Sequence, residues 1–116
     1  MNDHPFTVAL HSYPAGTTVL QVAGDLDHHT APHLQEALGR TPFTPTGQVV
    51  VDLAELTYCD STGITVLVTA YQRAQAVGGS FSLAAVNPDL MRVFQVTGLA
   101  EVFTIHPTVE QAIDPH

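Results

Sequence analysis

Hydrophobic residues recur along this chain in short blocks with two different spacings. Residues 6–10, 17–22, 48–53, 81–86 and 102–105 form short apolar runs, several of them β-branched or alternating, as is typical of strands. Between these runs, apolar residues recur three and four positions apart, which is the spacing of one face of a helix. The pattern therefore predicts strands interleaved with helices, beginning with a hairpin.

Capping residues bound the segments that have helical spacing. Asp27 or Thr30 can cap the first of these helices, Asn87 followed by proline can start the third, and Thr108 fits a capping box for the last. Glycines at the ends of the segments are placed to stop them. The predicted helices cover residues 30–39, 64–77, 88–98 and 108–113.

The second of these helices is ambiguous by propensity alone. Residues 64–69 are rich in β-branched side chains, which favour strands. The apolar residues of the segment nevertheless fall at i, i+3, i+4 and i+7, at Ile64, Leu67, Val68 and Tyr71. This spacing favours a helix.

A hairpin followed by alternating helices and strands predicts an α/β fold. We expect a mixed, mostly parallel sheet of four to five strands with about four helices, in a single domain over residues 1–116. Functional sites in such sheets form at the carboxyl ends of strands. The polar segments 25–29 and 58–63 each follow a strand and precede a helix, so we expect them on the same edge of the sheet.

The charge of the chain narrows the range of partners. Eleven acidic residues face three arginines and no lysine, for a net charge of −8. Such a surface repels phosphate backbones and anionic lipids, which argues against nucleic-acid and membrane binding, and it favours a partner that contributes arginines. No apolar run is long enough to span a bilayer and no signal peptide is recognised, so we expect a cytoplasmic protein.

Ser61 is the main candidate for chemistry. It stands in the segment Tyr-Cys-Asp-Ser-Thr-Gly at the predicted start of a helix, where either Asp60 or Ser61 can act as the cap. Gly63 keeps this turn free of side-chain bulk, so a partner can approach the Ser61 hydroxyl. The segment lacks the first glycine of a nucleophile elbow, and the neighbouring aspartate supplies no general base. We therefore predict that the protein is not an enzyme.

Other reactive residue types give no further site. His29 and His33 lie four residues apart, but no third metal ligand accompanies them at a recognised spacing, so we expect no metal. Cys59 has no cationic neighbour to activate it, and a single cysteine excludes an internal disulfide. The chain has no glycine-rich phosphate loop, and we expect no cofactor.

Three segments resemble the STAS-domain anti-sigma factor antagonists of bacterial partner-switching systems. They are Gly-Asp-Leu-Asp-His-His-Thr-Ala at residues 24–31, the stretch from Val-Asp-Leu to Asp-Ser-Thr-Gly at residues 51–63, and Val-Thr-Gly-Leu at residues 96–99. The middle segment is the most specific, because members of the family carry Asp-Ser-Ser/Thr-Gly there. The resemblance covers nearly the whole chain and implies the STAS fold.

The resemblance also implies a switch. It implies that Ser61 is phosphorylated by an anti-sigma factor acting as a serine kinase, and that the unphosphorylated form binds this anti-sigma factor and frees the sigma factor. It further implies a metal-dependent serine phosphatase that reverses the modification. The residues expected to contact the partner are Asp25, Asp27, His28, Asp60, Thr62 and Gly63.

Alternatives stay open for several of these residues and for the function. Ser61 can be an ordinary helix cap, and Asp25 and Asp27 can be a cap and a solvated turn. Asp52, at the end of a buried strand, is expected to be structural, and its carboxylate could support the Ser61 loop. The alternative function is a STAS scaffold that is not switched, or an accessory subunit of a transporter or larger signalling complex.

Overall fold

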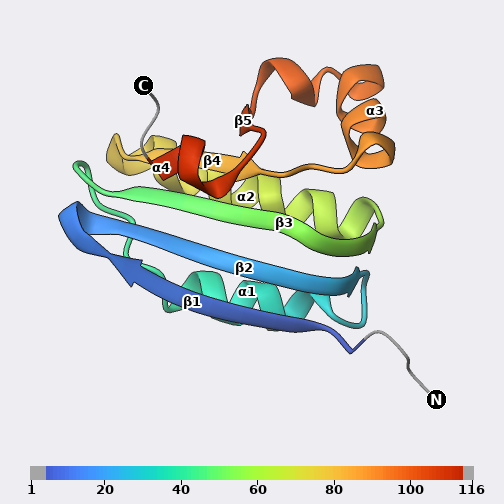
Figure 1. Ribbon diagram of the computed structural model, residues 1–116, viewed down its shortest axis with the longest axis horizontal. Coiled ribbons are helices and arrows are strands. Elements are labelled where there is room, and N and C mark those ends of the chain that lie inside the picture. Colours follow the sequence, from blue (N-terminus) through green and yellow to red (C-terminus); the bar gives the residue numbers. More distant parts are fainter. Residues whose placement is uncertain (1–4, 114–116) are drawn as a thin grey trace.

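The computed structural model describes residues 5–113 and shows a five-stranded sheet covered by helices (Figure 1). The strands lie side by side in chain order, as β1 (Thr7–Tyr13), β2 (Thr17–Leu26), β3 (Gln48–Cys59), β4 (Ser80–Ala84) and β5 (Thr104–His106). β1 pairs antiparallel with β2, and every other neighbouring pair is parallel. The helices are α1 (Ala31–Gly39), α2 (Ser61–Val77), α3 (Pro88–Thr97) and α4 (Val109–Ile113).

This architecture confirms the predicted α/β class and the mixed, mostly parallel sheet. The extent of the domain over residues 1–116 stays a prediction, since the structure describes neither end of the chain. The predicted hairpin is also present, and the strands β1 and β2 are joined by a short turn at Pro14–Gly16. Ala15 in this turn has a φ of 67°, in the region that side chains other than glycine rarely adopt.

The strands β2 and β3 are longer than predicted. The polar pair Gly24-Asp25 breaks the apolar pattern and predicts the end of the second strand near residue 22, yet β2 continues to Leu26 and β3 continues to Cys59. Parallel pairing holds these extensions together, with Asp25 opposite Tyr58 and Leu26 opposite Cys59. The register shifts between Gly24 and Asp25, where Gly24 has a φ of 96°. A bulge at Gly24 therefore lets β2 continue through Asp25 to Leu26.

The ambiguous segment is a helix, as its apolar spacing predicts. α2 runs for 17 residues and ends at Gly78, which takes a left-handed φ of 74°. The hydroxyls of Thr65 and Thr69 donate hydrogen bonds to the carbonyl oxygens of Ser61 and Thr65, at 2.9 and 3.0 Å. The hydroxyl groups of these threonines therefore find hydrogen-bond acceptors within the helix, which allows β-branched residues to lie on its exposed side.

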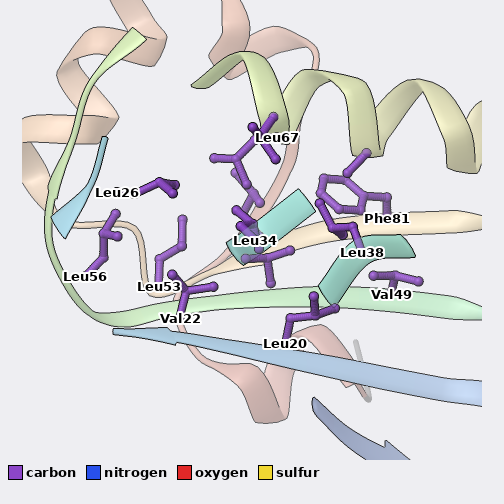
Figure 2. Close-up of a cluster of buried hydrophobic side chains, with 14 of the residues drawn as sticks. Leu20, Val22, Leu26, Leu34, Leu38, Val49, Leu53, Leu56, Leu67 and Phe81 are labelled. Carbon is purple, nitrogen blue, oxygen red and sulfur yellow. The ribbon is translucent and has the colours of Figure 1, made fainter. Parts of the chain in front are cut away.

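The two faces of the sheet are covered unequally. Because the strands follow one another in one direction, right-handed connections place α1 and α2 on the same face, behind the sheet in Figure 1. The main core lies between that face and these helices (Figure 2). Its large side chains include Leu20, Val22, Leu26, Leu34, Leu38, Val49, Leu53, Leu56, Leu67 and Phe81.

The opposite face of the sheet is covered in part by α4. A smaller cluster of buried residues lies there, made of Val19, Val50, Ala84 and Ala112. The side-chain amide of Gln48 donates a 2.6 Å hydrogen bond to the carbonyl oxygen of Ala112, which ties α4 to β3. The cap predicted for this helix is present, since the Thr108 hydroxyl accepts a hydrogen bond from the Gln111 N–H at 3.1 Å. α4 has only five residues, so part of this face stays open.

Candidate functional site

Two polar loops meet at the carboxyl ends of β2 and β3, at the right-hand end of the sheet in Figure 1. The N–H of Asp60 donates a 3.0 Å hydrogen bond to the carbonyl oxygen of Leu26, which joins one loop to the other. The Thr57 hydroxyl donates a second hydrogen bond to the Asp25 carboxylate. The predicted placement of both segments on one edge is therefore confirmed. Residues 25–30 and 57–63 are called the rim below.

Asp60 is the cap of α2. Its backbone is extended, and its carboxylate accepts a 3.1 Å hydrogen bond from the N–H of Gly63. Its carbonyl oxygen accepts the first helical bond, from Ile64 at 3.1 Å. Ser61 is the first residue of the helix and is exposed, and no described residue forms a hydrogen bond with its hydroxyl. Of the two possible caps, the structure uses the aspartate and leaves the serine hydroxyl available.

Gly63 faces the interior of the protein. A Cβ at this position would stand 2.6 Å from Cγ of Leu26 and 2.8 Å from Sγ of Cys59. Real Cβ atoms do not approach other atoms so closely, so a side chain here would push α2 away from the end of β2. The glycine therefore sets how closely the start of α2 packs against the rim, in addition to any contact with a partner. Thr62, beside it, is exposed.

Asp27 organises the other loop. Its carboxylate accepts hydrogen bonds from the N–H groups of His29 at 2.9 Å and Thr30 at 3.1 Å. The Thr30 hydroxyl donates to the carbonyl oxygen of Asp25 at 2.7 Å and makes no bond with the first turn of α1. Asp27 therefore supplies the turn before α1, and Thr30 ties the turn back to the end of β2.

The same contacts act on the ionisation of Asp27. Desolvation raises the pKa of its carboxyl group, while the hydrogen bonds from Thr30 and His29 lower it by more, so that the pKa lies below its ordinary value of 3.8. Asp27 is thus a carboxylate at neutral pH. His28, at the tip of the loop, is exposed and its ring lies 4.0 Å from that of His29.

The described part of the rim is acidic. Asp25, Asp27 and Asp60 all belong to it. Arg73 lies on α2 about 18 Å further along the helix axis, by the ordinary rise of an α-helix. It donates a 3.0 Å hydrogen bond to the carbonyl oxygen of Leu38 and lies over the ring of Phe43, so it is engaged at the far end of the molecule. A partner for the rim is therefore expected to bring positive charge of its own.

One exposed tyrosine of the rim was not among the predicted contacts. Tyr58, at the end of β3, is 54% exposed and lines a cavity of about 270 Å³ together with Asn87, Leu90 and Val93 from the start of α3. Large aromatic side chains left in the open are enriched at protein interfaces. In the sequence, Tyr58 follows the polar Thr57 and lies beyond the predicted end of the strand at Leu53, and this position was the one sign that its ring is not buried.

Two residues near Ser61 have other roles. Partial burial, followed by the negative charge of Asp60, raises the pKa of the Cys59 thiol to about 12, in keeping with the expected lack of activation. Asp52 does not support the Ser61 loop. It accepts a 3.0 Å hydrogen bond from the N–H of Ala54 and lies on the α4 face of the sheet.

The described residues show no metal site and no membrane span. Between residues 5 and 113, no group of three or more His, Cys, Asp or Glu side chains is arranged to hold a metal ion. No helix in the same range is both long enough and apolar enough to cross a bilayer.

Sequence comparison decides the family. The model of the STAS domain matches residues 12–112 of this chain. The chain belongs to the STAS-domain family. This STAS domain is 34% identical over 84 residues to an anti-sigma-B factor antagonist of Listeria monocytogenes, and the match covers 72% of this chain and 74% of that protein.

Solved structures of similar proteins have the same fold. The STAS domain matches an anti-sigma factor antagonist from Mycobacterium paratuberculosis with a TM-score of 0.82 and 29% identity, over 94% of this chain and 92% of that one. It matches the Bacillus cell fate determinant SpoIIAA in its phosphorylated form with a TM-score of 0.75 and 25% identity, over 94% and 98% of the two chains. The family resemblance seen in the three sequence segments is thereby confirmed.

Proposed function

We propose that this protein is an anti-sigma factor antagonist that is switched by phosphorylation of Ser61. In the unphosphorylated form, the rim binds an anti-sigma factor with serine kinase activity, and the sigma factor is released. Phosphoryl transfer to Ser61 ends this complex, and a metal-dependent serine phosphatase restores the binding form. The protein itself acts in the cytoplasm by binding, with no catalytic group, cofactor or metal of its own.

The observation that carries the proposal is that Asp60 caps α2 and leaves the exposed Ser61 hydroxyl free of that role. A serine at a helix start is ordinarily explained as a cap, and here the aspartate makes the capping bond. The Ser61 side chain is exposed in an acidic rim, and the capping bond that begins α2 does not use it. Its position is open to a kinase. The names of the relatives, including one in a phosphorylated form, support the same conclusion.

Electrostatics explain how such a modification would act. A phosphoserine adds about 1.5 to 2 negative charges at neutral pH. The amino end of α2 favours an anion, while the Asp60 carboxylate opposes it. Because Ser61 is exposed and its hydroxyl forms no hydrogen bond with a described residue, its phosphate requires little rearrangement inside the protein. The switch is therefore electrostatic and steric at the interface, where the added charge and bulk meet groups fitted to a neutral hydroxyl.

Intact mass spectrometry tests the modification. The protein is incubated with ATP, magnesium and each serine-kinase anti-sigma factor of the source organism, next to the Ser61→Ala variant. Thr69→Ala is the matched control, because Thr69 carries an exposed hydroxyl on the same helix and lies outside the rim. We expect one added phosphoryl group in the native protein and in Thr69→Ala, and none in Ser61→Ala. Modification that persists in Ser61→Ala would refute the assignment.

Binding measurements test the rest of the proposal. Asp25→Asn and Asp27→Asn keep the oxygen acceptors of the loop and remove its charge, and we expect each to weaken binding to the anti-sigma factor. Glu36→Gln, on the exposed side of α1, is the control and should bind as the native protein does. Stable binding without any phosphorylation would favour the scaffold that is not switched. Backbone NMR shifts far from Ser61 on phosphorylation would contradict a local switch.

A further inference from the structure

A second cavity lies on the opposite face of the sheet, away from the core helices. It has a volume of about 520 Å³ and lies between β1, β2, β3 and the start of α4. His11 and Tyr13 on β1, Gln21 on β2 and Asp52 on β3 contribute polar side chains to it. Because α4 has five residues, it covers only part of this face and leaves the cavity open. No step of the proposed switch uses these residues.

Strand pairing places the polar residues on one face. Asp52 is the register partner of Gln21, and Val19 is the register partner of both His11 and Val50. Residues next to Asp52 in the chain, Val51 and Leu53, belong to the core on the other side. Since side chains alternate along a strand, Asp52 is directed away from the core and into the cavity.

The Asp52 carboxylate is the unusual feature of this cavity. The residue is only 8% exposed. One of its oxygens accepts the 3.0 Å hydrogen bond from Ala54, and no described residue donates to the other. The second oxygen is not closed off from solvent and faces the open cavity, and no arginine or lysine lines the cavity beside it. A cation that enters the cavity and meets this oxygen is stabilised by it.

The other residues that line the cavity are suited to a ligand with a positive charge and an apolar part. Glu110, from α4, supplies a second carboxylate, and no arginine or lysine is among the lining residues. Val19, Pro107 and Val109 line other parts of the wall with apolar surface. The net charge of −8 attracts cations towards the whole molecule, which raises their local concentration. The walls thus combine negative charge with apolar surface.

We propose that this cavity binds a small organic cation, an alkylguanidinium or alkylammonium group whose charge meets Asp52 and whose stem packs on the apolar wall. The ligand chemistry is that of a guanidinium or an amine on an aliphatic chain. Such a site is distinct from the Ser61 switch, since it shares no residue with the rim.

Titration with a matched pair of ligands tests the charge. Butylguanidinium and butylurea have nearly the same shape, and only the first is charged. With backbone NMR as the readout, we expect butylguanidinium to shift the amide signals of His11, Ala54 and Thr108 saturably, with a dissociation constant of about 1 mM or below for a ligand of this size. Butylurea should bind about tenfold more weakly or not at all. Equal binding of the two would overturn the proposal.

Variants test whether the ligand binds in the cavity beside Asp52. Asp52→Asn keeps an oxygen acceptor for Ala54 and removes the charge, and we expect it to weaken butylguanidinium binding about tenfold or more. Ala54→Leu narrows the cavity without changing any charge and should weaken binding, so the proposal stays testable even if Asp52→Asn folds poorly. Glu36→Gln, on α1, should leave binding unchanged. Loss of binding in Glu36→Gln, or full binding in Ala54→Leu, would show a nonspecific attraction instead.

A blocked arginine separates the two natural sources of such a group. Acetyl-arginine methylamide presents the guanidinium as a protein side chain would, with a peptide backbone at its root. Binding equal to that of butylguanidinium would assign the site to an arginine of a partner protein, and much weaker binding would assign it to a free small molecule. Failure of both to bind would overturn the site itself.

Discussion

Replacing Gly63 with alanine tests whether α2 is packed against the rim as tightly as the structure shows. The added Cβ would stand 2.6 Å from Cγ of Leu26 and 2.8 Å from its Cδ2. Leu26 is fully buried in the core and cannot swing into solvent (Figure 2). The strain of forcing one methyl group into a packed interior is typically about 1–3 kcal/mol. Alanine recovers roughly 1 kcal/mol of this, because it is the better helix former.

The expected net effect is a loss of up to about 2 kcal/mol in the free energy of unfolding. Gly39→Ala is the matched control, since Gly39 is also helical and a Cβ there would have no neighbour within 4 Å. It shows the helix-propensity gain without the clash. Urea denaturation measures both variants, with the slope of the transition confirming that the unfolded surface is unchanged. The reasoning fails if Gly63→Ala stabilises the protein as much as Gly39→Ala does.

Three further changes have expected outcomes. Asp60→Ala removes the cap of α2 and should reduce the free energy of unfolding by about 1 kcal/mol. Asp60→Asn can still cap the helix and should reduce it far less. Equal losses of the two variants in urea denaturation would contradict the capping bond. Burial raises the pKa of the Cys59 thiol from 9.0 to about 12, so at pH 8 iodoacetamide should alkylate it much more slowly in the folded than in the urea-unfolded chain, as followed by mass. Because the folded state holds this proton more tightly, the stability from Cys59 is complete below pH 9.0 and falls as the pH rises towards 12. Ala15→Asn should raise the free energy of unfolding by roughly 0.5–1 kcal/mol, because asparagine tolerates the left-handed backbone of the turn; a loss would show that Ala15 is not strained.

The order of strands and helices and the position of the rim follow from local patterns. The spacing from Ile64 to Tyr71 predicts α2 despite its β-branched residues. Of the apolar residues at that spacing only Leu67 is fully buried, and the buried face of the helix consists of Gly63, Val66, Leu67, Ala70 and Ala74. The rule that sites form at the carboxyl ends of strands brings Asp25 and Ser61 to one edge. These inferences need only the neighbours of each residue in the chain.

Other features depend on residues that are far apart in the sequence. The ends of β2 and β3 were predicted too early, since their last residues are held by pairing with each other and not by their own polarity. The sequence shows that Gly63 has no side chain, but only the position of Leu26 gives the reason. The cavity around Asp52 likewise forms where β1, β3 and α4 meet, so its residues share no local motif.

The hydrogen bond between Asp60 and Leu26 has a consequence for the entropy of association. Both rim loops are fixed in the free protein, one to the end of β2 and the other by the turn of Asp27 and Thr30. A partner therefore meets backbone segments that have already lost their conformational freedom during folding, and ordering them does not oppose binding. In a complex formed this way, the calorimetric heat capacity change should match the surface buried between the two proteins, with no contribution from a loop that folds on contact.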